Sequence, residues 1–195
     1  MSCHPTLRKH DTSQFVNDAQ NAMLKELGKA RNASEFIGRI PGAISVLQSY
    51  AQRLREGKVP LQDLVLTKAV TRQIDEYTVM TNSVAALKQM KSRGYSVEPG
   101  EYIRFLVTDG QSRIFEKKVK VAEFLEGGEE PDVSEYLRLL CRAGETLLLP
   151  FGHTEVKLLE TCNAGTPPRA ALALAESSHA EIRRRGGPGY ISYRR

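Results

Sequence analysis

The order of apolar and polar positions predicts helices in the first 57 residues. In DTSQFVNDAQNAMLKELG, residues 11–28, apolar side chains recur every four positions between candidate N-caps and a glycine, as in an amphipathic helix. A second helical pattern begins near residues 32–34, is interrupted at Pro41, and resumes until Gly57. We therefore expect two or three helices that pack as an antiparallel hairpin.

Strand patterns begin after this helical part. The run LVL at residues 64–66 predicts a short buried strand that continues into polar residues. The segment YIRFLVT, residues 102–108, alternates between two faces, and the pair Asp109 and Gly110 predicts a hairpin turn into a strand near residues 113–121. These signals indicate a small antiparallel sheet.

Two more helices are predicted around these strands. One is expected from about residue 84 to residue 93, and its candidate N-caps are Thr81, Asn82 and Ser83. The other follows Asp132 and Glu135, whose Asp-x-x-Glu spacing resembles a capping box. The fold class predicted from the whole pattern is α+β, mostly helical with a small antiparallel sheet or hairpin.

Composition limits the class of protein. A chain of 195 residues with 41% hydrophobic residues fits one folded domain. It has neither an apolar stretch near the roughly 20 residues that span a bilayer nor the apolar segment of a secretory signal, so we expect a soluble cytoplasmic protein. The three cysteines lack the spacing of a zinc site or a disulfide framework and are expected to be free thiols.

The net charge of +5 is unevenly distributed. Residues 1–100 hold 14 Lys and Arg against 9 Asp and Glu, residues 101–160 hold 8 against 12, and residues 161–195 hold 6 against 2. This asymmetry fits a polyanionic partner such as nucleic acid, and it also fits ordinary surface variation. The last segment is rich in Gly, Pro, Ala, Ser and Arg, which predicts a flexible basic tail with one short helix at about residues 168–185.

The sequence contains no recognisable catalytic constellation. Neither glycine-rich phosphate-loop pattern, GxxxxGK(S/T) or GxGxxG, occurs, and no Asp-x-Asp ends a predicted strand. The four histidines lie near the termini or in predicted loops. The acidic residues Glu126, Glu129, Glu130 and Asp132 lack the spacing of a calcium loop and fit a solvated turn. We therefore predict no catalytic, cofactor-binding or metal-binding residues in this chain.

From residue 59 to residue 152 the motifs follow one another in the order found in one family. VPLQDLVLTKAVTRQIDEY is followed by a capped helix ending in KSRG, then by VEPGEYIRFLV, a hairpin, DVSEYLRLL and LLLPFG. Together these segments resemble the thumb, the C-terminal domain of archaeal-type family B DNA polymerases. Its elements read approximately L-V-I-x-x-x-L-T-R-x-x-x-x-Y, P-G-x-x-I-x-Y-V-I and D-x-x-Y-Y. LRKHD, before the first helix, resembles the V-R-R-x-D segment that leads from palm into thumb.

The chain also departs from the family pattern. Asn82 and Ser83 stand where the family has Pro-His before the central helix, and Glu135 replaces the first tyrosine of D-x-x-Y-Y. The C-terminal GYISYRR lacks the family's usual clamp-binding signature. These departures put in doubt any contact that needs that His or Tyr, and a sliding-clamp contact through this tail.

The resemblance implies three parts: a helical segment from the palm junction (1–58), a thumb core (59–160) and a basic tail (161–195). The family's catalytic aspartates lie in the palm, in D-x-x-S-L-Y-P and Y-G-D-T-D, and neither motif occurs here. We therefore expect the small, non-catalytic subunit of a split polymerase. Its large partner would hold exonuclease, palm and fingers and the catalytic Mg²⁺, with no cofactor in this chain.

A thumb holds primer–template duplex through phosphates and groove shape rather than base sequence. The expected DNA-binding residues are Arg8, Lys9, Lys68, Thr71, Arg72, Asn82, Ser83, Lys88, Lys91 and Arg93. Thr71 and Arg72 match the family's Thr-Arg pair and are the first choices. The alternative for the lysines and Arg93 is a solvated surface side chain, and for Asn82 and Ser83 it is a simple helix cap.

Two other functions stay open on the sequence. The chain fits a stand-alone DNA-binding or regulatory module derived from a thumb, and it fits a piece of a whole polymerase. As a subunit it is expected to be nucleoid-associated and to join its partner near Phe15 and Met23 of the first helix, unless these residues are core. Tyr77 and Tyr136 are expected to be packing residues with one polar end.

Overall fold

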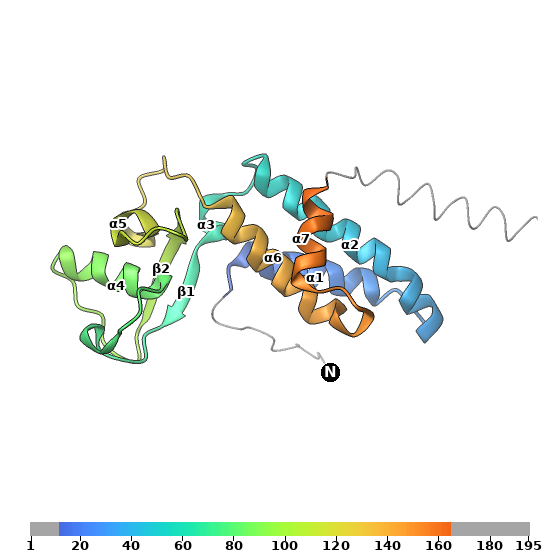
Figure 1. The fold of residues 1–195 in the computed structure, drawn as a ribbon, viewed down its shortest axis with the longest axis horizontal. Helices are drawn as coiled ribbons and strands as arrows, with labels where there is room; N and C mark the ends of the chain where they lie inside the picture. Colours follow the sequence, from blue (N-terminus) through green and yellow to red (C-terminus); the bar gives the residue numbers. More distant parts are fainter. Residues whose placement is uncertain (1–11, 165–195) are drawn as a thin grey trace, which may run out of the picture.

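Two lobes make up residues 12–164, the part of the chain that the computed structural model describes (Figure 1). The helical lobe contains α1 (Gln14–Leu27), α2 (Ala33–Arg55), α6 (Val133–Leu148) and α7 (Glu155–Asn163). The sheet lobe contains α4 (Asn82–Ser92), β1 (Leu66–Ala69), β2 (Tyr102–Val107) and β3 (Val119–Val121). The short elements are α3 (Leu61–Leu64), η1 (Ile74–Glu76), α5 (Phe115–Lys118), η2 (Ala122–Phe124) and η3 (Leu149–Phe151). The predicted α+β class is confirmed.

Helices α1 and α2 pack as the predicted hairpin, and α6 and α7 complete the core of this lobe. Phe15 and Met23 are 3% and 0% exposed, so of the two alternatives for these residues the core is confirmed and the joining surface is excluded. Within residues 12–164, no helix combines the length and the apolar composition that crossing a membrane requires.

Helix α2 is continuous through Pro41, where the sequence predicts an interruption. A proline inside a helix removes one backbone N–H and one helical hydrogen bond. Buried side chains nevertheless recur at helical spacing on both sides of it, at Ile40, Ala43, Leu47 and Ala51. Their packing against the other helices offsets the lost hydrogen bond and keeps one long helix.

The sheet is antiparallel, with β2 between β1 and β3. The predicted strand at residues 64–66 begins only at Leu66, because Leu61–Leu64 forms the helical turn α3. Asp109 does start a turn, since the N–H of Ser112 donates to its carbonyl at 3.0 Å. The prediction of a strand over residues 113–121 is wrong for most of its length: α5 precedes β3 there.

Gln89 of α4 accounts for this shorter strand. Its side-chain amide donates to the carbonyl of Phe115 at 2.9 Å and to that of Val119, and its side-chain oxygen accepts from the N–H of Val121 at 3.2 Å. Buried backbone groups need such partners. The three hydrogen bonds give backbone groups of α5 and β3 a side-chain partner in place of a neighbouring strand, and they hold α4 against the sheet.

Tyr136 of α6 joins the two lobes. Its buried hydroxyl donates to the carbonyl of Leu64 at 2.8 Å and accepts from the N–H of Val107 at 3.1 Å. The N–H of Asp132 donates to the carbonyl of Val107 at 2.9 Å, and the Asp132 carboxylate accepts from Gly110 at 2.8 Å. Asp132 is the N-cap of α6, because the same carboxylate accepts from the N–H of Glu135 at 3.0 Å. The reciprocal half of the predicted capping box is not formed, since the N–H of Asp132 donates to Val107.

Burial raises the pKa of Tyr136 far above its ordinary value, so the hydroxyl stays protonated and remains a donor. We expect Tyr136→Phe to lower the free energy of unfolding by about 2–4 kcal/mol, since it leaves a buried carbonyl and a buried N–H without partners. Urea unfolding measures this loss. Tyr95→Phe is the matched control, because Tyr95 is 56% exposed, and it should change stability by less than about 0.5 kcal/mol. Equal effects of the two substitutions would contradict the prediction.

Candidate nucleic-acid interface

Strand β1 directs the chain out of the sheet at Val70. Leu66 and Val70 are buried and anchor the strand, and two backbone hydrogen bonds of 2.8 Å join Val70 to Glu101 and Gly100 beyond the end of β1. The next residues, Thr71 and Arg72, are exposed. The pattern of a buried run followed by polar residues therefore marks the point where the backbone leaves the core.

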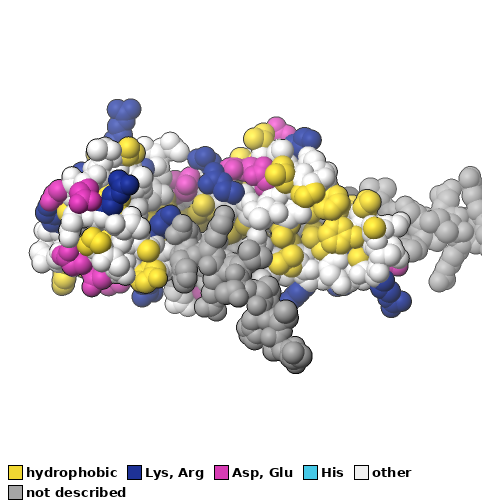
Figure 2. Space-filling model, turned by 90° about the horizontal axis from the view of Figure 1, so that it is seen from below, with side chains coloured by type: hydrophobic (Ala, Val, Ile, Leu, Met, Phe, Trp, Pro, Cys, Tyr) yellow, Lys and Arg dark blue, Asp and Glu magenta, His cyan; other side chains and the backbone are white. Residues whose placement is uncertain are grey.

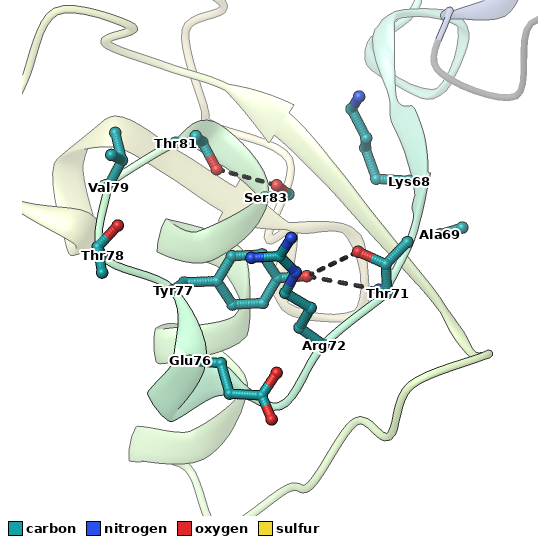
Figure 3. A pocket seen from close by; sticks show the side chains of 10 residues that line it. All are labelled: Lys68, Ala69, Thr71, Arg72, Glu76, Tyr77, Thr78, Val79, Thr81 and Ser83. Atoms are coloured by element: carbon teal, nitrogen blue, oxygen red, sulfur yellow. Dashed lines mark hydrogen bonds between the residues drawn. The ribbon is translucent and has the colours of Figure 1, made fainter.

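A hollow of about 600 Å³ opens beside this exit (Figure 3). It lies between the end of β1, the segment that follows it, and the start of α4. Its lining residues are Lys68, Ala69, Thr71, Arg72, Glu76, Tyr77, Thr78, Val79, Thr81 and Ser83. Two cations, one carboxylate and five hydroxyl groups thus face a common space.

Tyr77 ties the segment after β1 into a loop. Its hydroxyl accepts from the N–H of Thr71 and pairs with the Thr71 hydroxyl, both at 3.4 Å (Figure 3). The side-chain hydrogen bond with Thr71 is the main reason that the pKa of Tyr77 is lowered. The ring of Tyr77 packs against the core, as expected, so the loop is anchored at both ends.

The first turn of α4 is the second wall of the hollow. Thr81 is its N-cap: the Thr81 hydroxyl accepts from the N–H of Val84 at 3.3 Å and lies 3.0 Å from the hydroxyl of Ser83. Among the three candidate caps, Asn82 and Ser83 are therefore the first two residues of the helix. The first N–H groups of a helix have no partner within it, so this turn offers backbone donors to an anion.

The structure separates the other predicted DNA-binding residues from the hollow. The ammonium of Lys91 lies 3.0 Å from the carboxylate of Asp75. The guanidinium of Arg93 stacks over the ring of Phe124, with 4.0 Å to the ring centroid. Lys88 and Asn82 are half-buried and do not line the hollow. Of the predicted residues, the hollow brings together Lys68, Thr71, Arg72 and Ser83, while Arg8 and Lys9 lie outside the described residues.

Sequence reasoning did not assign six of the ten lining residues to the site, and three of the six carry hydroxyl groups. Tyr77 was expected to pack, Thr81 to cap a helix, and Thr78 was given no role. Four short hydroxyl side chains between residues 71 and 83 were the available signal. Within residues 12–164, no group of three or more His, Cys, Asp or Glu side chains is placed to hold a metal ion.

Comparisons with known proteins assign this chain to a family. The model of the family described as DNA polymerase family B matches residues 6–150, which is most of the chain. The chain therefore belongs to DNA polymerase family B.

Curated relatives and a solved structure agree with this assignment. A DNA polymerase of Pyrococcus horikoshii is 27% identical over 146 residues, which are 74% of this chain and 11% of the relative. A DNA polymerase of Thermococcus gorgonarius is 24% identical over 151 residues, 77% of this chain and 19% of the relative. The family B polymerase of Pyrobaculum calidifontis shares the fold, with a TM-score of 0.57 and 22% identity over 71% of this chain and 17% of that one. This chain thus spans less than a fifth of the relatives it matches.

The position of the cap can be tested by two neighbouring substitutions. Thr81→Ala removes the hydroxyl that accepts from Val84, and we expect it to cost about 1 kcal/mol of unfolding free energy. Asn82→Ala is the matched control and should cost less than about 0.5 kcal/mol. Chemical unfolding of both variants measures the difference. A larger loss for Asn82→Ala would show that the helix is capped elsewhere.

Proposed function

We propose that the chain is the small, non-catalytic thumb subunit of a split family B DNA polymerase. It grips primer–template duplex DNA and so supports processive synthesis in replication or repair. The observation that carries the proposal is the hollow between β1 and α4, in a chain of this family. Hydroxyls, helix N-terminal amides and an arginine are the groups that hold phosphates without reading bases.

The contacts in the hollow suit a DNA backbone. Arg72 stands on an exposed loop that Tyr77 anchors, so its planar guanidinium is accessible to a phosphate from a backbone held in place. Thr71 and Ser83 add short donors on opposite sides of the hollow. Two cations against one carboxylate give a small positive excess, which attracts phosphate only moderately. A subunit with moderate affinity of its own grips DNA mainly when a partner holds it beside the active site.

Nucleotidyl transfer belongs to that partner in this proposal. The palm motifs D-x-x-S-L-Y-P and Y-G-D-T-D are missing from the sequence. The partner is a larger polypeptide with exonuclease, palm and fingers, and its carboxylates would hold the Mg²⁺ ions that stabilise the transferring phosphoryl group. The chain then acts as an enzyme only within the complex, at the nucleoid.

The helical lobe carries the surface that we assign to this partner. Figure 2 shows exposed apolar side chains gathered over this lobe. Its large exposed apolar residues are Leu24, Ile37, Leu149, Phe151 and Val156. The rings of Phe36 and Phe151 are in contact at 5.5 Å between centroids, so α2 and η3 form one surface. We assign this surface to the catalytic partner because the relatives are more than five times longer than the part that this chain matches. In the proposal, the partner supplies the remaining polymerase domains and covers the exposed apolar side chains.

Arg72→Ala should weaken binding of the isolated chain to primer–template duplex about tenfold at low salt, the loss expected for one charge-assisted hydrogen bond. It should also reduce the slope of log affinity against log salt by about 1, because one phosphate contact is lost. Fluorescence anisotropy over a salt series measures both. Arg31→Ala, an exposed arginine of the helical lobe, should change neither. An unchanged slope for Arg72→Ala would contradict the role of this residue.

Reconstitution with the catalytic polypeptide, identified by co-purification, distinguishes a subunit from a stand-alone module. We expect the chain to lengthen the products of primer extension. Ile37→Asp should abolish both co-purification and this stimulation, because it puts a charge on a 60% exposed apolar contact. Ile114→Asp is the matched control, because Ile114 is 51% exposed on the sheet lobe. This variant should still co-purify with the catalytic polypeptide and still stimulate primer extension. A chain that binds DNA but neither recruits nor stimulates a polymerase would favour the stand-alone module.

A further inference from the structure

A second group of exposed side chains lies at the C-terminal end of α4. Arg93, Tyr95 and Phe124 form this aromatic cluster. The guanidinium carbon of Arg93 is 4.0 Å from the centroid of the Phe124 ring, and the centroids of the Tyr95 and Phe124 rings are 5.9 Å apart. With a rise of about 1.5 Å per residue, α4 places the cluster about 15 Å from the hollow at its other end.

A tight turn builds the cluster. Gly94 has a φ of +82°, a left-handed conformation that favours glycine, and the N–H of Tyr95 donates to the carbonyl of Met90 at 3.0 Å. The turn brings both Arg93 and Tyr95 next to Phe124, which is half-buried and packs against the core. Phe124 therefore anchors two side chains that reach into solvent.

Two side chains of the cluster, Tyr95 and Arg93, remain exposed to solvent. Tyr95 is 56% exposed, although its ring is large and apolar. Arg93 is exposed and has no ion-pair partner among residues 12–164, so the Phe124 ring is the contact that positions its guanidinium, and the rest of the group stays open to solvent. Planar side chains with open faces are the groups on which unpaired bases stack.

We propose that the aromatic cluster is a binding site for an unpaired nucleobase of single-stranded DNA. The neighbouring charges favour a base over a phosphate. Glu123 precedes Phe124, and the ammonium of Lys120, four residues before Phe124 in the sequence, lies 3.8 Å from carboxylate oxygens of both Glu126 and Glu129. The three carboxylates offset the positive charges of Lys120 and Arg93, so this segment has little net attraction for a phosphate, whereas a neutral base face needs none. The site is separate from the hollow, so it does not depend on duplex binding there.

The test uses the full chain and a single-stranded oligonucleotide that contains 2-aminopurine, whose fluorescence falls when it stacks. The wild-type chain should quench the probe. Tyr95→Ala should weaken the binding about 5- to 100-fold, the range for stacking one base. Tyr95→Phe should restore it, because the ring and not the hydroxyl makes the contact. The salt dependence should stay nearly unchanged, since no phosphate contact is lost.

Control variants distinguish binding at this cluster from the loss of any exposed tyrosine, from DNA binding at the hollow, and from unfolding. Tyr102→Ala is the matched variant, because Tyr102 is 55% exposed on the same lobe, and it should bind the probe as the wild type does. Arg72→Ala should lower duplex affinity and leave the quenching intact. Tyr95→Ala with wild-type quenching, or equal losses in Tyr95→Ala and Tyr102→Ala, would overturn the inference. Thermal unfolding followed by circular dichroism verifies that each variant is folded.

Discussion

The hydroxyl of Tyr136 is the constraint on which the arrangement of the two lobes depends. It contacts the backbone at Leu64, just before β1, and at Val107, the last residue of β2. One side chain of α6 thereby fixes the start of the edge strand and the end of the central strand. Because β1 leads directly to Thr71 and Arg72, the direction in which these residues face is set from the helical lobe.

Local patterns in the sequence predicted the elements whose signals are local. The cap of α6 at Asp132 and the helical hairpin of α1 and α2 are cases in which neighbouring residues supply the whole signal. Predictions from the sequence were wrong where contacts with residues distant in the sequence determine the local structure. Packing on both sides of Pro41 keeps α2 continuous, and Gln89, 26 residues before Phe115, satisfies the backbone where a strand was expected.

The candidate site was predictable only where its sequence signal is local. The polar exit of β1 at Thr71 and Arg72 could be read from the sequence, because a buried run stops there. The contacts of Lys91 and Arg93 could not be read from the sequence, because their partners, Asp75 and Phe124, come from other segments of the chain. The cations that the sequence places on one helix face form an ion pair and a stacked arginine, and the groups that we propose for phosphate binding lie at the opposite end of α4.

Amide hydrogen exchange of the chain, with and without primer–template duplex, tests the central claim most directly. If the hollow grips the DNA backbone, duplex slows exchange in residues 68–83, where the loop after β1 and the first turn of α4 meet the phosphates. The helical lobe around residues 36–43 then exchanges as before. Unchanged exchange in residues 68–83 at saturating duplex, or protection confined to the helical lobe, would contradict the account.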